Sequence, residues 1–216
     1  MTRRIEQIWP PYGLVVEAGD LRMTALREAD VPEVVDVVAQ GIHDPSWTPF
    51  LFPWTDAPAA ELPADYMRFF ASTVARTADG HVSLELVVRR GGEVVGMQAL
   101  NGRDVASTRR LESGSWLGRR FQGAGLGTRM RQMVCAFAFD HLGLDVVTSS
   151  AWEDNAASRR VSAKVGYRET GRAEAERRGV MTPEVFFELR PEELVRGPDE
   201  VRATGVGELR RFVGLA

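Results

Sequence analysis

The sequence lacks the features of secreted, membrane-spanning or disulfide-linked proteins. Cys135 is the single cysteine among 216 residues. No disulfide can therefore form within the chain, and a reducing compartment such as the cytoplasm is expected. No apolar run approaches the ~20 residues that a membrane-spanning helix needs, so no membrane association is expected. The first eleven residues carry two arginines but no apolar segment, and we expect no secretory signal there.

The sequence also lacks an excess of charge of one sign. It has 27 lysines and arginines against 30 aspartates and glutamates, a net charge of −3. Neither nucleic acid nor an anionic membrane is therefore an expected partner. Two of the three histidines, His81 and His141, have no metal-ligand spacing with each other or with Cys135, so no metal is expected. Length and composition indicate one globular domain, or one domain with an appendage.

Hydrophobic periodicity predicts an α/β protein with a mixed, mostly antiparallel sheet and helices on both faces. The predicted strands are 21–26, 82–90, 93–102, 109–118, 144–152, 167–171 and 185–190. The predicted helices are 31–41, 62–78, 125–141 and a last one that is capped by Asp154 or Asn155 and ends at Gly166. Residues 1–20 are interpreted as an irregular lead. Residues 42–63, rich in proline and aromatics and called here the aromatic loop, are interpreted as a structured loop, and residues 191–216 as a weakly patterned extension.

The most informative segment follows the strand at 109–118. Three glycines alternate just before a long apolar helix. Such a turn leaves main-chain N–H groups uncovered at a helix start, where the helix dipole favours anions, and a diphosphate is the natural ligand. The amides predicted to hold it belong to the glycine turn, residues Gln122, Gly123, Ala124, Gly125, Leu126, Gly127 and Thr128.

Two familiar phosphate-binding motifs do not fit this turn. A P-loop needs Lys followed by Ser or Thr after its last glycine, whereas Thr128 and Arg129 follow here. A dinucleotide fingerprint needs its third glycine one position later and an acidic residue at the end of the next strand, whereas Asp145 lies at the start of that strand. Three antiparallel strands before the motif also disagree with a doubly wound sheet.

The pattern instead resembles the GNAT superfamily of acyltransferases. Residues 122–127 match its Q/R-x-x-G-x-G/A signature, and residues 155–167 resemble its next helix, N-x-x-S-x-x-V-x-x-K-x-G-F/Y. Gly114-Ser115-Trp116-Leu117-Gly118 resembles the branch that acylates ribosomal-protein N-termini. The resemblance covers residues 21–190. Residues 41–54 and 104–118 are similar to an actinobacterial subgroup that includes a succinyl-transferring member.

Membership would imply a pair of splayed central strands and a site for the co-substrate acetyl-CoA or another acyl-CoA, with succinyl-CoA among the candidates. Backbone groups of Trp116 and Leu117 would bond the pantetheine arm, and one N–H there could polarise the thioester carbonyl. Asn155 would cap its helix and reach the same arm, and Ser158 lies one turn later on the same face. Each residue also has a purely structural interpretation. Trp116 could be a core aromatic residue, Asn155 a helix cap only, and Ser158 a surface serine.

Catalytic groups are less well defined by the sequence. Amine attack needs a proton acceptor, and the candidates are Glu112, in the strand before the turn, and His43 in the aromatic loop. Glu112 is the first choice and could equally be a solvated strand carboxylate, whereas His43 is the second, because a loop histidine is more often structural. Where many family members have a tyrosine acid, this chain has Ser162. Cys135 is expected to fill the core. Four aromatic side chains of the loop are predicted to form the wall of the substrate-binding site: Trp47, Phe50, Phe52 and Trp54. The alternative is that these rings only cover the edge of the sheet.

The sequence therefore predicts an N-acyltransferase that moves an acetyl or other short acyl group to a primary amine by direct attack. The acceptor could be a protein N-terminus, a lysine or a small molecule. A non-catalytic acyl-CoA-binding module and a nicotinamide-dependent oxidoreductase are the two alternatives. The extension at 191–216 contains enough apolar residues to dock, and we expect it to pack on a second subunit of a homodimer or larger homo-oligomer.

Overall fold

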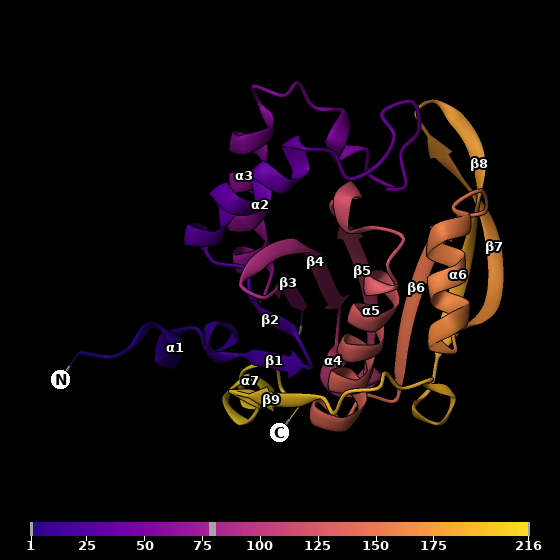
Figure 1. Ribbon diagram of the computed structural model, residues 1–216. Helices are drawn as coiled ribbons and strands as arrows, with labels where there is room; N and C mark the ends of the chain where they lie inside the picture. The colour runs from indigo at the N-terminus through magenta and orange to yellow at the C-terminus, as the bar shows by residue number, and fades with distance from the viewer. Residues whose placement is uncertain (1, 78–80, 216) are drawn as a thin grey trace.

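The computed structural model describes residues 2–77 and 81–215, and within them nine strands form one sheet (Figure 1). The strands are β1 Val15–Ala18, β2 Leu21–Ala25, β3 Val82–Arg90, β4 Glu93–Gly102, β5 Arg110–Leu117, β6 Val146–Trp152, β7 Arg168–Arg177, β8 Val180–Leu189 and β9 Arg202–Thr204. Their order is β7-β8-β6-β5-β4-β3-β2-β1-β9. Every neighbouring pair is antiparallel except β5 and β6, which confirms the predicted mixed sheet.

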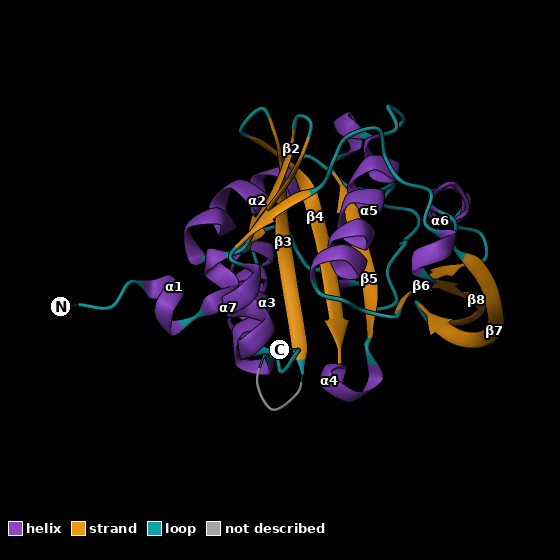
Figure 2. Cartoon of the chain, turned by 90° about the horizontal axis from the view of Figure 1, so that it is seen from below, coloured by secondary structure: helices purple, strands orange, loops and turns teal. Residues whose placement is uncertain are grey.

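Helices cover both faces of this sheet, as predicted. They are α1 Ile5–Ile8, α2 Val31–Ala39, α3 Leu62–Arg76, α4 Val105–Thr108, α5 Leu126–Ala136, α6 Ala156–Val165 and α7 Val206–Phe212. Helices α2 and α3 lie on one face, and α5 and α6 lie on the other (Figures 1 and 2). Ala78, the predicted end of the second long helix, lies outside the described residues. The sheet between α3 and α5 therefore forms the scaffold of the site.

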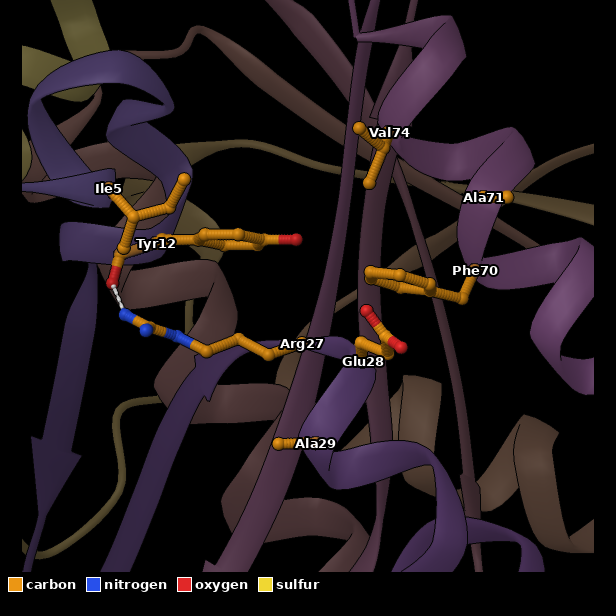
Figure 3. A pocket seen from close by; sticks show the side chains of 8 residues that line it. All are labelled: Ile5, Tyr12, Arg27, Glu28, Ala29, Phe70, Ala71 and Val74. Carbon is orange, nitrogen blue, oxygen red and sulfur yellow. Dashed lines mark hydrogen bonds between the residues drawn. The ribbon is translucent and has the colours of Figure 1, made fainter.

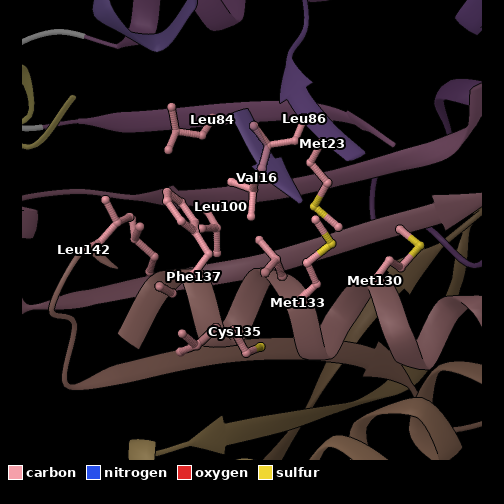
Figure 4. Packing of buried hydrophobic residues seen from close by; sticks show 14 of the residues in the cluster. Val16, Met23, Leu84, Leu86, Leu100, Met130, Met133, Cys135, Phe137 and Leu142 are labelled. Atoms are coloured by element: carbon pink, nitrogen blue, oxygen red, sulfur yellow. The ribbon is translucent and has the colours of Figure 1, made fainter. Parts of the chain in front are cut away.

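The main core lies between α5 and the sheet. Met130 and Met133 of α5 are buried against side chains of β2, β3 and β4 (Figure 4). Cys135 belongs to this cluster and is fully buried, which confirms it as a core residue. Burial raises the pKa of its thiol to about 11, so the thiolate is scarce at neutral pH. A nucleophilic role for this cysteine is therefore not supported.

Three local predictions were wrong. Residues 1–20 are not irregular, because they contain α1 and the strand β1, which pairs with β2. Strand β1 has only four residues, too short for a clear alternating pattern. Strands β7 and β8, each ten residues long, form a hairpin that turns at Arg178 and Gly179, and both are longer than the predicted segments. Helix α4, between β4 and β5, was missed because it is a single turn.

The N-terminal segment also forms one wall of an open groove on the outside of α3 (Figure 3). Ile5 and Tyr12 lie across from Phe70 and Val74, around a volume of about 780 Å³. Arg27 fixes the near wall, since its Nη2 donates to the main-chain oxygen of Tyr12 at 2.6 Å. This groove lies away from the glycine turn.

The C-terminal extension docks on its own chain, whereas the sequence analysis expected its apolar residues to pack on a second subunit. Strand β9 pairs with β1 and extends the sheet. Helix α7 then places Leu209, Val213 and Leu215 in the main core, each with less than a tenth of its surface exposed. The weak periodicity of this segment concealed a short strand and a two-turn helix.

We expect Leu209→Ala to destabilise the whole protein, because Leu209 is completely buried. Removing a buried leucine side chain costs about 2–5 kcal/mol. The measurement is the free energy of unfolding in urea for Leu209→Ala, with Phe212→Ala, a more exposed residue of the same helix, as the control. A change below ~1 kcal/mol for Leu209→Ala would contradict docking of α7 on the core.

Candidate functional site

Strands β5 and β6 separate in the middle of the sheet. They pair in parallel at only three positions, from Arg110 opposite Val146 to Glu112 opposite Thr148. Beyond that point β5 continues along β4 to Leu117, and β6 continues along β8 to Trp152. The opening between them is called the splay. Residues 114–115 of β5 are exposed there, although the strand is central. The predicted splayed strand pair is confirmed.

Side-chain hydrogen bonds close the narrow end of the splay. The hydroxyl of Ser113 donates to the carbonyl of Thr148 at 3.1 Å, and the hydroxyl of Ser149 donates to the carbonyl of Ser113 at 3.1 Å. The Tyr167 hydroxyl lies 2.7 Å from Ser113 Oγ. Short serines fit where two strands begin to part, and their hydroxyls replace the missing ladder bonds.

The glycine turn lies at the wide end of the splay, directly after β5. The backbone N–H groups of residues 123–127 donate to no acceptor among the residues that the structure describes. Gly123 and Gly125 have φ of +81° and +78°, the left-handed conformation that glycine adopts freely, and a Cβ at either would meet nothing within 4 Å. The turn therefore presents consecutive free donors at the start of α5, a geometry suited to a diphosphate.

Gln122 and Thr128 differ from the other predicted donors. The amide of Gln122 donates to the carbonyl of Arg119, and that of Thr128 donates to Gly125. The side chain of Gln122 instead fixes the turn, since its Nε2 donates to the carbonyls of Ile42 at 2.8 Å and Leu117 at 2.9 Å. Glutamine at this position thus joins the turn to both β5 and the aromatic loop.

Helix α6 forms the other side of the splay. Asn155 caps it, with Oδ1 accepting from the Ser158 amide at 3.0 Å. This cap leaves the Nδ2 donors of Asn155 for a ligand. One turn further, Ser162 is 1% exposed and its hydroxyl has no partner among the described residues. A buried hydroxyl without a partner is costly and marks a place for one.

An aromatic cavity opens on the other face of the sheet, between α3 and β5, with a volume of about 870 Å³. Three of the four predicted wall residues, Phe50, Phe52 and Trp54, line it, together with Tyr66, Phe69 and Trp116. Gly114 and Ser115 also line it, so the cavity reaches the splay. Its walls are mainly apolar, with few charged side chains, which is typical of small-ligand sites.

The aromatic loop ties the two arms of the sheet together. The indole nitrogen of Trp47 donates to Asp154 at 3.2 Å, and that of Trp152 donates to the carbonyl of Phe50 at 3.3 Å. Arg178, at the tip of the β7–β8 hairpin, pairs with Asp56. The loop therefore crosses from the α2–α3 side to the β6–β8 side (Figure 1). Trp47 is a tether here and does not line the cavity.

Glu85 is a cavity residue that sequence reasoning missed. It projects from β3 into the aromatic cavity, and Asn101 Nδ2 donates to its Oε1 at 3.3 Å. Burial raises the pKa of Glu85 to about 7, near the optimum for proton transfer in neutral solution. The available signal was a carboxylate within the apolar run Val82-Ser83-Leu84-Glu85-Leu86, which a buried strand does not otherwise tolerate.

The two predicted catalytic groups lie in different surroundings. Glu112 is at the end of the paired part of β5 and its residue is exposed to solvent. Partial desolvation by neighbouring protein atoms raises its pKa, the Glu184 carboxylate adds to this shift, and the Arg131 charge opposes it. Glu184 is 6% exposed and lies opposite Trp152 in the β6–β8 register. His43 has both ring nitrogens within hydrogen-bond distance of oxygens, of Asp44 and Thr55, and does not line the cavity.

A free-amide turn at the mouth of a splayed parallel strand pair, backed by a cavity on the opposite face, defines an acyl-coenzyme A type of domain. The chain matches the acetyltransferase (GNAT) domain family over residues 20–168, and it belongs to that family. Among residues 2–77 and 81–215, no three His, Cys, Asp or Glu side chains gather as metal ligands, and no helix is long and apolar enough to cross a membrane.

Known proteins resemble the chain in sequence or in fold. A segment of 82 residues is 33% identical to YdaF of Bacillus subtilis, provisionally named a ribosomal N-acetyltransferase. This match covers 38% of the chain and 44% of YdaF, so it spans less than half the length of that relative.

Two solved structures share the fold. Mycobacterium smegmatis RimJ in complex with CoA-disulfide has a TM-score of 0.72 at 20% identity, over 94% of this chain and 95% of RimJ. RimL, a ribosomal L7/L12 alpha-N-protein acetyltransferase solved with coenzyme A, has a TM-score of 0.69 at 17% identity, over 82% of this chain and 97% of RimL. At these identities the likeness shows the fold alone.

Proposed function

We propose that the protein is an acyl-CoA-dependent N-acyltransferase. The free N–H groups of residues 123–127 carry the proposal, because consecutive uncovered donors at a helix start are built for a diphosphate. The pantetheine arm would then lie in the splay, bonded by backbone groups of Trp116 and Leu117. Asn155 Nδ2 and Ser158 would face the arm from α6. The coenzyme complexes of RimJ and RimL support this assignment.

The acceptor amine would enter through the aromatic cavity, because this cavity is lined by Gly114 and Ser115 of the splay, where the thioester would lie. The amine nitrogen attacks the thioester carbonyl carbon, the C–N bond forms, and the C–S bond breaks as coenzyme A leaves as a thiolate. The nitrogen loses a proton to a carboxylate, and Ser162 donates a hydrogen bond to the leaving sulfur. Direct attack in a ternary complex follows, since Cys135 is buried and protonated.

Three groups are proposed as proton acceptors. Glu85 has the best combination of position and pKa. Glu112 is the second, because it lies at the splay with a raised pKa. His43 is the third, and it would first have to release Thr55. Phe50, Phe52 and Trp54 would form the acceptor wall, and Trp47 would hold that wall in place.

The proposal also covers the acceptor, the acyl group, the cellular compartment and the oligomeric state. The names of YdaF and RimL favour a protein N-terminus as acceptor over a lysine or a small amine. The acyl group is acetyl or another short acyl, with succinyl included. A reducing cytoplasm suits the free thiol of Cys135. We also propose a homodimer or larger homo-oligomer, to be measured by light scattering.

Coenzyme A is expected to raise the melting temperature of the protein, and NAD is not. At ~100 times the dissociation constant, one bound ligand adds about 2.7 kcal/mol to the free energy of unfolding. For a chain of this size each kcal/mol shifts the melting temperature by about 2–4 °C. No shift with coenzyme A, or an equal shift with NAD, would contradict the proposal. Release of free coenzyme A from acyl-CoA with a panel of amines separates an enzyme from a binding module.

A further inference from the structure

The floor of the aromatic cavity carries only small side chains next to the splay. Glu85 on β3 lies opposite Ala99 on β4, and Ala99 lies opposite Gly114 on β5, so the three residues form one row across the sheet. Residues in such a row share a face, and all three line the cavity. Neighbouring strands are about 4.8 Å apart, so a small group above Ala99 is one strand spacing from both Glu85 and Gly114. This leaves room for an amine between a carboxylate and the place where the thioester would lie.

The rows on either side of this floor differ in polarity. On one side Met97 faces Trp116, and both line the cavity. On the other side Asn101 faces Glu112, and neither lines it. Along the sheet, the cavity therefore extends from the floor toward the apolar row. A substituent on an amine at the floor would lie against Met97 and Trp116.

Aromatic rings continue this apolar row as one connected cluster. The ring centroid of Trp54 lies 6.3 Å from that of Trp116, 5.2 Å from that of Phe50 and 5.9 Å from that of Tyr66. Phe69 extends the cluster, with its ring centroid 5.5 Å from that of Tyr66. All five residues line the cavity of about 870 Å³. An amine with a short polar chain would leave most of this volume as water against apolar walls, whereas a large apolar substituent replaces that water.

The other charged side chains of the cavity lie at its mouth. Asp65, Arg68 and Arg76 come from one helix, α3, and both arginines are exposed. Arg68 pairs with Asp65. The charge of Arg76 opposes the rise in the pKa of Glu85. Among the described residues that line the cavity, Glu85 is therefore the charged group at the floor, and its anion attracts an ammonium group.

We propose that the acceptor amine is attached to a large apolar group, with an aromatic ring as the best fit. This rests on the proposed function and adds the chemical class of its acceptor. The amine would lie over Ala99 beside Glu85, and the apolar group would pack against Met97, Trp54 and Trp116. Two sources share this chemistry: a protein whose first residue has a large apolar side chain, and a free arylalkyl amine. A small or polar group next to the amine would leave the ring cluster uncovered.

The test measures kcat/KM for release of coenzyme A with two pairs of acceptors, at saturating acetyl-CoA and with succinyl-CoA in parallel. The first pair is two tetrapeptides that begin with phenylalanine or serine and are otherwise identical. The second pair is phenethylamine and ethanolamine, which carry the same two kinds of group without a peptide. Within at least one pair, the phenyl compound is expected to have a kcat/KM at least about tenfold higher than its polar partner, because burial of a phenyl group contributes that much.

Phe69→Ser is expected to reduce this preference by about twofold to tenfold, since it removes one ring of the cluster. Phe69 is 36% exposed, so the variant is expected to fold. Phe212→Ser is the matched control, because Phe212 is 39% exposed, lies on α7 and does not line the cavity. This control should keep the wild-type ratio between the two members of each pair.

The outcomes separate this inference from the proposed function. A preference in the peptide pair identifies a protein N-terminus as the source of the amine, and a preference in the free-amine pair alone identifies a small molecule. Equal values in both pairs, or higher values for the polar members, overturn the inference and leave the proposed function standing. An undiminished preference in Phe69→Ser would place the apolar group outside the cavity and overturn the inference as well. If Phe69→Ser fails to fold, the wild-type ratios decide. If no acceptor, lysine included, releases coenzyme A, the proposed function is wrong and the inference falls with it.

Discussion

Gly125→Val is expected to lower the affinity for coenzyme A by about a hundredfold or more while the protein stays folded. Gly125 is the residue before α5, and its φ of +78° is strained for any residue with a Cβ. Valine would also place two methyl groups over the free N–H groups of the turn. Losing several charge-assisted hydrogen bonds, each worth about 1.5–3 kcal/mol, gives the expected size. Calorimetric titration with coenzyme A measures the effect.

Gly92→Val is the matched control for this substitution. Gly92 lies in the β3–β4 turn with a φ of +90°, and, as at Gly125, a Cβ there would meet nothing within 4 Å. Both variants should therefore lose similar stability, but Gly92→Val should bind coenzyme A like the wild-type protein. Equal affinities in the two variants would show that the glycine turn does not hold the coenzyme.

Glu85→Gln is expected to lower kcat by about a hundredfold or more, with little change in the affinity for coenzyme A. Proton acceptance by a positioned base contributes about 10²–10⁴ in rate. The pKa of Glu85 is about 7, so the rate in the wild-type protein should rise with pH through that value, and this rise should vanish in the variant. The measurement is the pH dependence of free coenzyme A release under saturating substrates.

Two further variants give this experiment its controls. Glu17→Gln alters an exposed carboxylate of β1 and should leave the pH profile unchanged. Glu112→Gln removes the second proposed base. If the rise near pH 7 persists in Glu85→Gln but is lost in Glu112→Gln, Glu112 is the base and the assignment to Glu85 is wrong.

The raised pKa of Glu85 also makes stability depend on pH. The unfolded carboxyl has a pKa of 4.5 and the folded one about 7, so between these values the folded state binds more protons. Stability therefore falls as pH rises from about 4.5 to 7, by at most about 3 kcal/mol. Glu85→Gln removes this contribution, so its unfolding free energy should change less over that window than that of the wild-type protein.

The sequence predicted those parts of the fold that have strong periodicity. Strands β3 and β4 and helix α6 were predicted almost to the residue, because their patterns are long and Gly91-Gly92, Asn155 and Gly166 mark their ends. Strand β1 and helix α7 were missed because four or seven residues do not establish a period. Both depend on tertiary packing, since β9 pairs with β1 and Leu209 docks on the core.

The glycine turn was the part of the site that the sequence predicted, because main-chain N–H groups define it. Alternating glycines before an apolar helix indicate free amides without any knowledge of tertiary contacts. Glu85 could not be assigned in the same way, because its one signal, a carboxylate within an apolar strand, does not show which cavity the side chain enters. Only the packing of α3 against β3 places this carboxylate in the aromatic cavity.

The early parting of β5 and β6 has a consequence for solubility. Although β5 is the fourth strand in a sheet of nine, beyond Glu112 the side of it that faces β6 is unpaired, like that of an edge strand. Unpaired strands of this kind recruit other chains into β-aggregates. The aromatic loop is tied to the β6 side of this gap by hydrogen bonds to Trp152 and Asp154, and we expect it to restrict the approach of another chain. Loosening that tether should therefore make the unliganded protein aggregate before it unfolds.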